Sequence, residues 1–354
     1  MMKDKVNFKV MAPIVAILIT FAVSLVILPV IKGEAKELPI SVVSLDQGMT
    51  TPQGDVNIGT QIASGITTKI EAAMAAKDPA ALKLVAIDDQ AKLDRAFENR
   101  DIYAAIVIPS DFTAQKLSGG NPEIKMIIDE GQSKAVATVL STMITSMSSD
   151  SEVPLTIEYL NPVGPNMANG NANMFAFIMS WIAALVCSIV LARAFQMGLD
   201  QSITSKLKLL LLAVLTALII AACVSFILKF EFGLGIEFGT TLGFLSIAVF
   251  CLMMLIIGVL SWSFVGGVVI FVTLMLLGLV ASSMPYEILP IFWQDYVYPW
   301  IPMRFMSDGI KEIFYMNGGI WNAGTQVLAW FGAAGILLIL LSALKKEKAE
   351  KDIG

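Results

Sequence analysis

The side chains of this chain allow few kinds of chemistry. The sequence contains no histidine, which excludes Ser-His-Asp and Cys-His catalysis as well as histidine-containing metal sites. The paired carboxylates Asp88-Asp89 and Asp129-Glu130 stand at the ends of predicted strands, where helix capping or solvation explains them better than acid–base catalysis. The sequence also lacks the Walker A, GxGxxG, CxxC and HExxH motifs. We therefore predict a protein that is not an enzyme, binds no ATP in a P-loop and needs no cofactor.

Residues 193–206 form one of two segments that could carry a mechanism. The segment mixes apolar and polar side chains between two predicted membrane spans, and its candidate contact residues are Phe195, Gln196, Met197, Leu199 and Asp200. Such a mixture suits a loop that docks a soluble partner. An amphipathic turn lying on the membrane surface explains the same pattern, and both interpretations stay open.

The second segment, residues 284–323, is rich in tryptophan and tyrosine, which favour the headgroup zone of a membrane. Within it, residues 302–315 predict a helix that begins at a proline and places its methionines and isoleucines on one face. The helix is predicted either to lie in the membrane interface or to form a re-entrant gate over a substrate path. Its candidate functional residues are Pro302, Arg304, Phe305, Asp308 and Lys311.

Long apolar stretches must position these two segments. With 56% hydrophobic residues and a mean hydropathy of +0.75, the chain differs from an ordinary soluble protein. Residues 11–31 carry no charged side chain and are long enough to cross a hydrocarbon core of about 30 Å. An uncleaved anchor explains them better than a cleaved secretory signal, whose apolar core is usually about 7–15 residues long. Five more spans are predicted within a membrane domain of residues 172–344, at residues 174–192, 207–228, 240–260, 264–282 and 325–344.

The positive charges orient these six spans. Basic residues prefer the cytoplasmic side of a membrane, and they are concentrated before residue 11, around residues 193–208 and after residue 344. The N-terminal residues 1–10 and the C-terminal residues 345–354 are therefore predicted to be cytoplasmic, and residues 32–171 extracellular. The expected fold is a polytopic α-helical membrane protein with six transmembrane helices and a small extracellular α/β domain between spans one and two.

Residues 32–171 alternate between strand and helix patterns, as in a small α/β domain. Strands are predicted at residues 39–45, 82–87, 103–108, 123–129 and 153–160, and the third of them is apolar enough for the centre of a sheet. Helices are predicted at residues 56–77, after Asp88 or Asp89, after Pro109, and on an apolar stripe of Val136, Val139, Leu140, Met143 and Met147. The Gly- and Asn-rich residues 161–173 predict a linker to the membrane domain.

Two motifs in this domain resemble those of a known family. Leu45-Asp46-Gln47-Gly48 is similar to a strand that ends in a Leu-Asp-x-Gly turn, and Tyr103 to Phe112 resembles a second family motif. Together with the single span before the domain and the linker after it, they make the chain resemble the YhgE/Pip family, within the superfamily of ABC-2 type transporter permeases. Many members carry a longer outer region rich in coiled coil, which this chain lacks.

The resemblance implies a permease subunit that works as a homodimer or heterodimer, with a separate ATPase bound at residues 193–206. It also implies that residues 284–323 correspond to the outer re-entrant element of the superfamily, and it brings no catalytic residue. The leading hypothesis is therefore the membrane-spanning subunit of an ABC-2 type exporter in the lipid bilayer of the plasma membrane. The alternative is a non-transporting cell-surface protein, such as a phage receptor, an envelope scaffold or a secretion-system accessory. No concentrated basic surface suggests a nucleic-acid partner.

Overall fold

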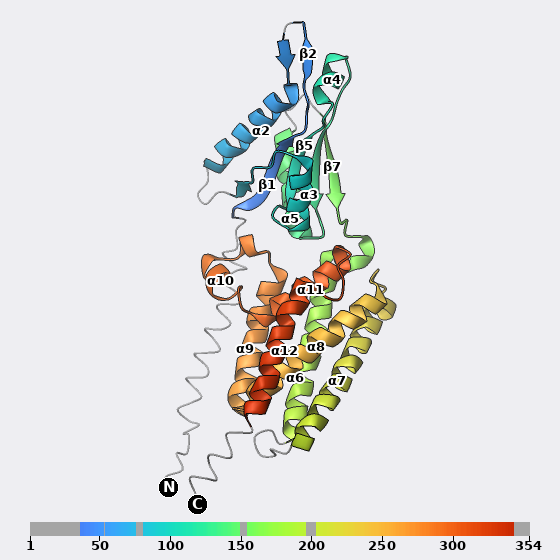
Figure 1. Cartoon of the computed structure of the whole chain (residues 1–354), viewed down its shortest axis with the longest axis vertical. Helices are drawn as coiled ribbons and strands as arrows, with labels where there is room; N and C mark the ends of the chain where they lie inside the picture. The colour runs from blue at the N-terminus through green and yellow to red at the C-terminus, as the bar shows by residue number, and fades with distance from the viewer. Residues whose placement is uncertain (1–35, 53, 76–80, 149–153, 196–202, 343–354) are drawn as a thin grey trace, which may run out of the picture. The chain divides into compact units, whose positions relative to one another are not determined.

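The computed structural model describes residues 36–52, 54–75, 81–148, 154–195 and 203–342. The chain divides into two compact units (Figure 1). One unit comprises Glu34–Pro165, and the other comprises Met1–Gly33 with Asn166–Gly354. The predicted first span, residues 11–31, lies outside the described residues.

The first unit is an α/β structure built on a mixed five-stranded sheet with the strand order β4-β1-β5-β6-β7. Strand β1 pairs in parallel with β4 and β5, β6 is antiparallel to β5, and β7 is parallel to β6. Its strands and helices are β1 (Leu38–Ser44), β2 (Met49–Thr51), β3 (Gly54–Val56), α2 (Ile58–Ala75), β4 (Leu82–Leu84), α3 (Gln90–Glu98), β5 (Ala104–Ile108), α4 (Phe112–Leu117), β6 (Ile124–Asp129), α5 (Lys134–Ser148) and β7 (Leu155–Leu160).

Both faces of the sheet are buried at β5, which explains why this strand is an unbroken apolar run. On one face, Leu93, Ala96 and Phe97 of α3 pack against Val43 and Val107. The residues of opposite parity, such as Ile40, Ile106 and Met126, are also buried. All five residues of β5 are buried in the middle of the sheet, so the predicted central strand is confirmed.

Most of the predicted strands and helices of this unit are confirmed, with three differences. Strand β4 is shorter than predicted, because it pairs with β1 over only three residues. The apolar stripe predicted for α5 is wrong at Val139, which is exposed, whereas Ile144 is buried. The antiparallel hairpin of β2 and β3 was not predicted.

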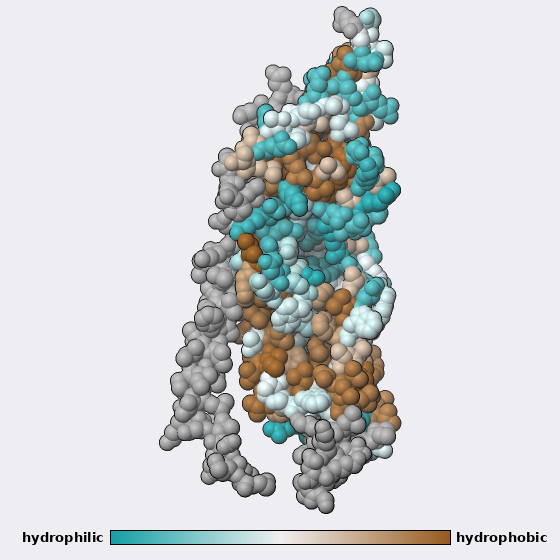
Figure 2. Space-filling view, turned by 60° about the vertical axis from the view of Figure 1, so that its left-hand side comes forward, coloured by the Kyte–Doolittle hydropathy of each residue, from teal (hydrophilic) through white to brown (hydrophobic). Residues whose placement is uncertain are grey.

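The second unit is a bundle of helices. They are α6 (Ala172–Ala194), α7 (Ile203–Phe226), α8 (Phe238–Leu260), α9 (Phe264–Ser283), α10 (Ile291–Tyr296), α11 (Pro302–Tyr315) and α12 (Ala323–Leu341), with short helical turns at Pro165–Gly170, Ile227–Glu231 and Tyr286–Ile288. Among the described residues, five helices are long and apolar enough to cross a membrane: α6, α7 with the turn that follows it, α8, α9 and α12. Figure 2 shows that the visible face of this unit is mostly hydrophobic, as a surface in contact with lipid requires.

Helix α8 is the most buried of the five and packs against α6, α7, α9, α11 and α12. Its tightest contact is with α12, where glycines replace side chains. A Cβ atom on Gly335 would lie 2.4 Å from the backbone nitrogen of Leu255, and one on Gly258 would lie 2.6 Å from the carbonyl oxygen of Gly335. Small residues therefore let these two backbones approach, as they do in membrane helix pairs.

Candidate functional site

Helix α11 is the amphipathic helix predicted at residues 302–315, and the structure places it within the bundle. Pro302 at its start has the fixed backbone angle that a first helical turn needs. The predicted apolar face is confirmed, because Met303, Met306, Ile310 and Ile313 are all buried. The helix packs against α6, α8, α9 and α12. A helix with neighbours on so many sides is held by the bundle and is not simply resting on its surface.

Two glycines allow α11 to approach its neighbours this closely. A Cβ atom on Gly278 of α9 would lie 2.5 Å from the Cγ atom of Met303. A Cβ atom on Gly324 of α12 would lie 2.3 Å from the carbonyl oxygen of Phe305. The position of α11 is therefore set by steric fit on two sides.

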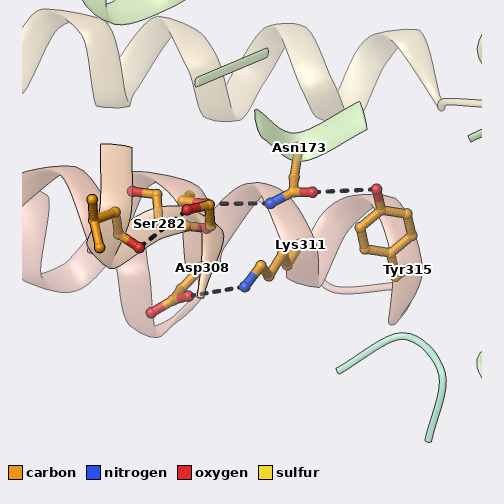
Figure 3. A network of polar contacts seen from close by, with 8 residues as sticks. Asn173, Ser282, Asp308, Lys311 and Tyr315 are labelled. Atoms are coloured by element: carbon orange, nitrogen blue, oxygen red, sulfur yellow. Dashed lines mark hydrogen bonds and ion pairs between the residues drawn. The ribbon is translucent and has the colours of Figure 1, made fainter. Parts of the chain in front are cut away.

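The charged residues of α11 lie along its less buried side. The guanidinium of Arg304 stacks between two rings, 4.1 Å from the centroid of Tyr298 and 4.4 Å from that of Phe305. Lys311 Nζ lies 3.9 Å from Asp308 Oδ1 (Figure 3). Of the five candidate residues on this helix, Arg304 and Phe305 thus contact each other, Asp308 and Lys311 form an ion pair, and Pro302 is buried at the start.

A polar network, drawn in Figure 3, joins α11 to α6 and α9. Asn173 near the start of α6 donates to Ser307 Oγ at 3.3 Å and accepts from the Tyr315 hydroxyl at 3.3 Å. Ser307 donates to the carbonyl oxygen of Ser282, the next-to-last residue of α9, at 3.3 Å. Burial raises the pKa of Tyr315 to about 12, so its hydroxyl keeps the proton that it donates.

The sequence analysis missed this network. Asn173 and Ser307 were each visible as a polar residue beside an apolar stretch, but they are 134 positions apart in the chain. Only the packing of α11 on α6 brings them together.

The other end of α6 leads into the predicted docking loop. The helix ends where the amide of Phe195 donates to the carbonyl oxygen of Leu191 at 3.0 Å. Of the candidate docking residues, only Phe195 is described, and Gln196, Met197, Leu199 and Asp200 lie outside the described residues. The structure therefore describes the two helices that flank the loop.

Both flanking helices are tied to other helices close to the loop. The guanidinium of Arg193 on α6 stacks on Phe264 of α9, 4.0 Å from the ring centroid. Lys206 on α7 is buried, and its Nζ donates to the carbonyl oxygen of Ile339 on α12 at 3.3 Å. A cation is favoured at this place, because the carbonyl groups at the end of a helix carry partial negative charge. A displacement of the loop would thus act on α9 and α12 as well as on α6 and α7.

In the α/β unit, Asp46 of the Leu-Asp-x-Gly turn holds two helix N-termini. Its Oδ2 accepts from the Gly59 amide of α2 at 2.9 Å and from the Thr113 hydroxyl, and its Oδ1 accepts from the Thr113 amide of α4 at 3.1 Å and from the Gly48 amide at 3.3 Å. Gly48 has a φ of +68°, which favours glycine. Burial opposes the charge of Asp46, but these hydrogen bonds together lower its pKa. The turn therefore has a structural role.

The paired carboxylates also have structural roles, as predicted. Asp89 caps α3 by accepting from the Lys92 amide at 2.7 Å. Asp129 accepts from the amides of Gly131 and Gln132 and from the side chain of Asn161. At least one oxygen of each carboxylate is thus occupied by neighbouring donors.

Comparison with known proteins matched the chain to a protein family and to no individual protein. No curated protein and no solved structure matches this chain. A family model described as "ABC-2 family transporter protein" matches residues 9–344, which include all five of the apolar helices. The chain therefore belongs to the ABC-2 transporter family, whose members are membrane permeases.

Proposed function

We propose that the protein is the permease subunit of an exporter and that a separate ATPase, bound at residues 193–206, drives it. The family match is the observation that carries this proposal. Within the ABC-2 family, the turn at Asp46 and the segment from Tyr103 to Phe112 favour the YhgE/Pip branch.

The proposed topology has six spans in the plasma membrane, with residues 11–31 as the first. The distribution of Lys and Arg supports cytoplasmic residues 1–10 and 345–354 and an extracellular α/β unit. The exposed apolar side chains of α7, such as Leu211 and Leu215, need lipid or a second permease subunit as a neighbour. We propose that a second permease subunit, either an identical or a similar one, covers this face in a homodimer or a heterodimer.

The contacts of α6 support a route by which the ATPase would act. The helix has 23 residues, so it is about 34 Å long at 1.5 Å per residue. It meets the docking loop at one end and the α11 network, through Asn173, at the other. A rigid helix with a partner at each end transmits a displacement, and we propose that α6 couples the ATPase to α11 in this way. Helix α11 would then act as the gate.

Copurification tests this function. The full-length protein, expressed with its genomic neighbours, is expected to bring down an ATPase. Phe195→Asp and Leu199→Asp are expected to abolish that association, because they place charge on the apolar contact residues of the loop. Lys229→Asp, in the helical turn that follows the far end of α7, is the matched control and should retain it.

A protein that brings down no ATPase, with or without these changes, would contradict the export function. That result would favour the non-transporting alternative, in which the α/β unit carries the function and loop changes are harmless.

A further inference from the structure

Arg304 is a cation in the helical unit whose guanidinium contacts two aromatic rings. Its guanidinium lies between Tyr298 and Phe305. Its Nε atom is buried and has no hydrogen-bond partner. None of the ion pairs among the residues that the structure describes includes Arg304. A half-buried charge is costly unless an opposite charge or hydrogen bonds compensate it, so this arginine is suited to receive an anion.

The nearest acidic residue on the same helix is otherwise engaged. Asp308 stands one helical turn after Arg304, where it could form an ion pair across the turn. Instead its Oδ1 lies 3.9 Å from Lys311 Nζ. Figure 3 shows the two side chains directed toward each other. Asp308 therefore forms no ion pair with the guanidinium.

Contact with the two rings restricts the orientation of the guanidinium, which favours binding of a phosphate or carboxylate group. A planar guanidinium presents a fork of N–H groups that matches two oxygens of a phosphate or carboxylate. Stacking between two rings restricts this plane before any ligand arrives, so less freedom is lost on binding.

The segment that carries Tyr298 favours an amphipathic ligand over a free ion. The segment before α11 exposes large apolar and aromatic side chains, including Ile291, Phe292, Tyr296 and Trp300. Such side chains favour the zone of a membrane where headgroups meet acyl chains. An amphipathic anion bound at Arg304 from this zone would place its apolar part against these exposed side chains.

We propose that Arg304 binds the phosphate of an anionic phospholipid, with the acyl chains lying along the exposed side chains of residues 291–300. The site would hold a lipid whether or not an ATPase is bound. The inference therefore goes beyond the export function and is tested separately from it.

The test uses the full chain in detergent and measures ligand binding by native mass spectrometry. The probe is dioctanoyl phosphatidylglycerol, compared with dioctanoylglycerol, which lacks the phosphate, and with glycerol 1-phosphate, which lacks the tails. The wild-type protein should bind the phospholipid at least about tenfold more tightly than either of the others, since each lacks one half of the recognised group.

The variants test the role of the arginine. Arg304→Gln should weaken phospholipid binding roughly ten- to a hundredfold, because charge-assisted hydrogen bonds to the phosphate are lost. Arg304→Lys keeps the charge and loses the planar fork, so its affinity for the phospholipid should lie between those of the wild type and Arg304→Gln. It serves as the test if the glutamine variant does not fold. Lys229→Gln is the matched control, because Lys229 Nζ already donates to the carbonyl oxygen of Ile236 at 3.0 Å, and it should bind like the wild type.

Two results would overturn the proposal. One is that folded Arg304→Gln binds the phospholipid as tightly as the wild type does. If only Arg304→Lys folds, equal binding by that variant has the same meaning. The other is glycerol 1-phosphate binding as tightly as the phospholipid, which would make the site one for a free phosphate.

Discussion

Replacing Asp46 by asparagine should destabilise the α/β unit strongly, although the change is nearly isosteric. The two carboxylate oxygens accept four hydrogen bonds, from Gly48, Gly59 and Thr113. An asparagine retains one acceptor oxygen. Its NH₂ group takes the place of the other oxygen and faces the groups that donated hydrogen bonds to it. With about 1.5–3 kcal/mol for a hydrogen bond to a charged group, we expect the free energy of unfolding to fall by about 2–4 kcal/mol. That is a large share of the roughly 5–15 kcal/mol that stabilises a typical domain.

The effect should depend on pH in one direction. Because the folded pKa of Asp46 is lowered, its stabilisation is fully present above the unfolded pKa of about 3.9 and is lost as the pH falls through the lower folded pKa. The difference between the wild type and Asp46→Asn should therefore be constant near neutral pH and shrink in acid.

Hydrogen exchange of the full-length protein, resolved by mass spectrometry, measures the effect in the α/β unit alone. The amides of β1 and β5 should exchange roughly thirty- to a thousandfold faster in Asp46→Asn, which corresponds to the expected free-energy loss. Unchanged exchange in both strands at neutral pH would refute the structural role of the turn.

Asp129→Asn is the matched control. All three donors to Asp129, from Gly131, Gln132 and Asn161, contact its Oδ1 atom, which an asparagine retains. Burial raises the pKa of Asp129 despite those donors, so its charge destabilises the fold above that pKa and the penalty disappears as the pH falls through it. Exchange in β1 and β5 should therefore be unchanged or slower in Asp129→Asn at neutral pH.

Two further substitutions test the packing of the helical unit. Gly335→Ala should lower the thermal unfolding temperature of this unit, because the new Cβ atom meets the backbone of α8 and such overpacking costs about 1–3 kcal/mol. Gly239→Ala is the control and should not lower it, because the space around Gly239 is open. Equal unfolding temperatures for the two variants would contradict the close contact of α8 and α12. Asn173→Leu should speed hydrogen exchange in α11, because Tyr315 loses its side-chain acceptor and Ser307 loses the donor from Asn173, at about 1–3 kcal/mol for each lost bond. Tyr315→Phe should have a smaller effect. Exchange like that of the wild type in Asn173→Leu would show that the network does not hold α11.

Local patterns in the sequence were enough to predict the regular parts of the fold. The apolar run of β5, the candidate caps Asp88 and Asp89 and the proline that begins α11 each predict a structure from a few neighbouring residues. The hairpin of β2 and β3 was missed because each strand has three residues, too few for a visible alternation. Val139 was misassigned because a period of 3.6 places it near the buried stripe, and only the position of the sheet decides which edge of the stripe is covered.

The candidate site could be predicted only in part, because its contacts join distant segments. The buried face of α11 follows from the spacing of its methionines and isoleucines. The stacking of Arg304 on Tyr298 and the bonds between Asn173 and Tyr315 depend on how α6, α9 and α11 pack together. Likewise, Asp46 was visible as part of a turn, but its bonds to Thr113 span 67 positions. Such non-local contacts have no signature in a single sequence.

The most direct test of the proposed coupling compares α11 with and without ATP in the complex of the protein and its ATPase. The complex is held in a lipid nanodisc, and hydrogen exchange of Pro302–Tyr315 is measured before and after a non-hydrolysable ATP analogue is added. We predict that the analogue changes exchange in α11 of the wild type and leaves it unchanged in Asn173→Leu, where the side-chain bonds of residue 173 to Ser307 and Tyr315 are lost. Exchange in α11 that is the same with and without the analogue, in a wild-type complex shown to bind it, would contradict the account.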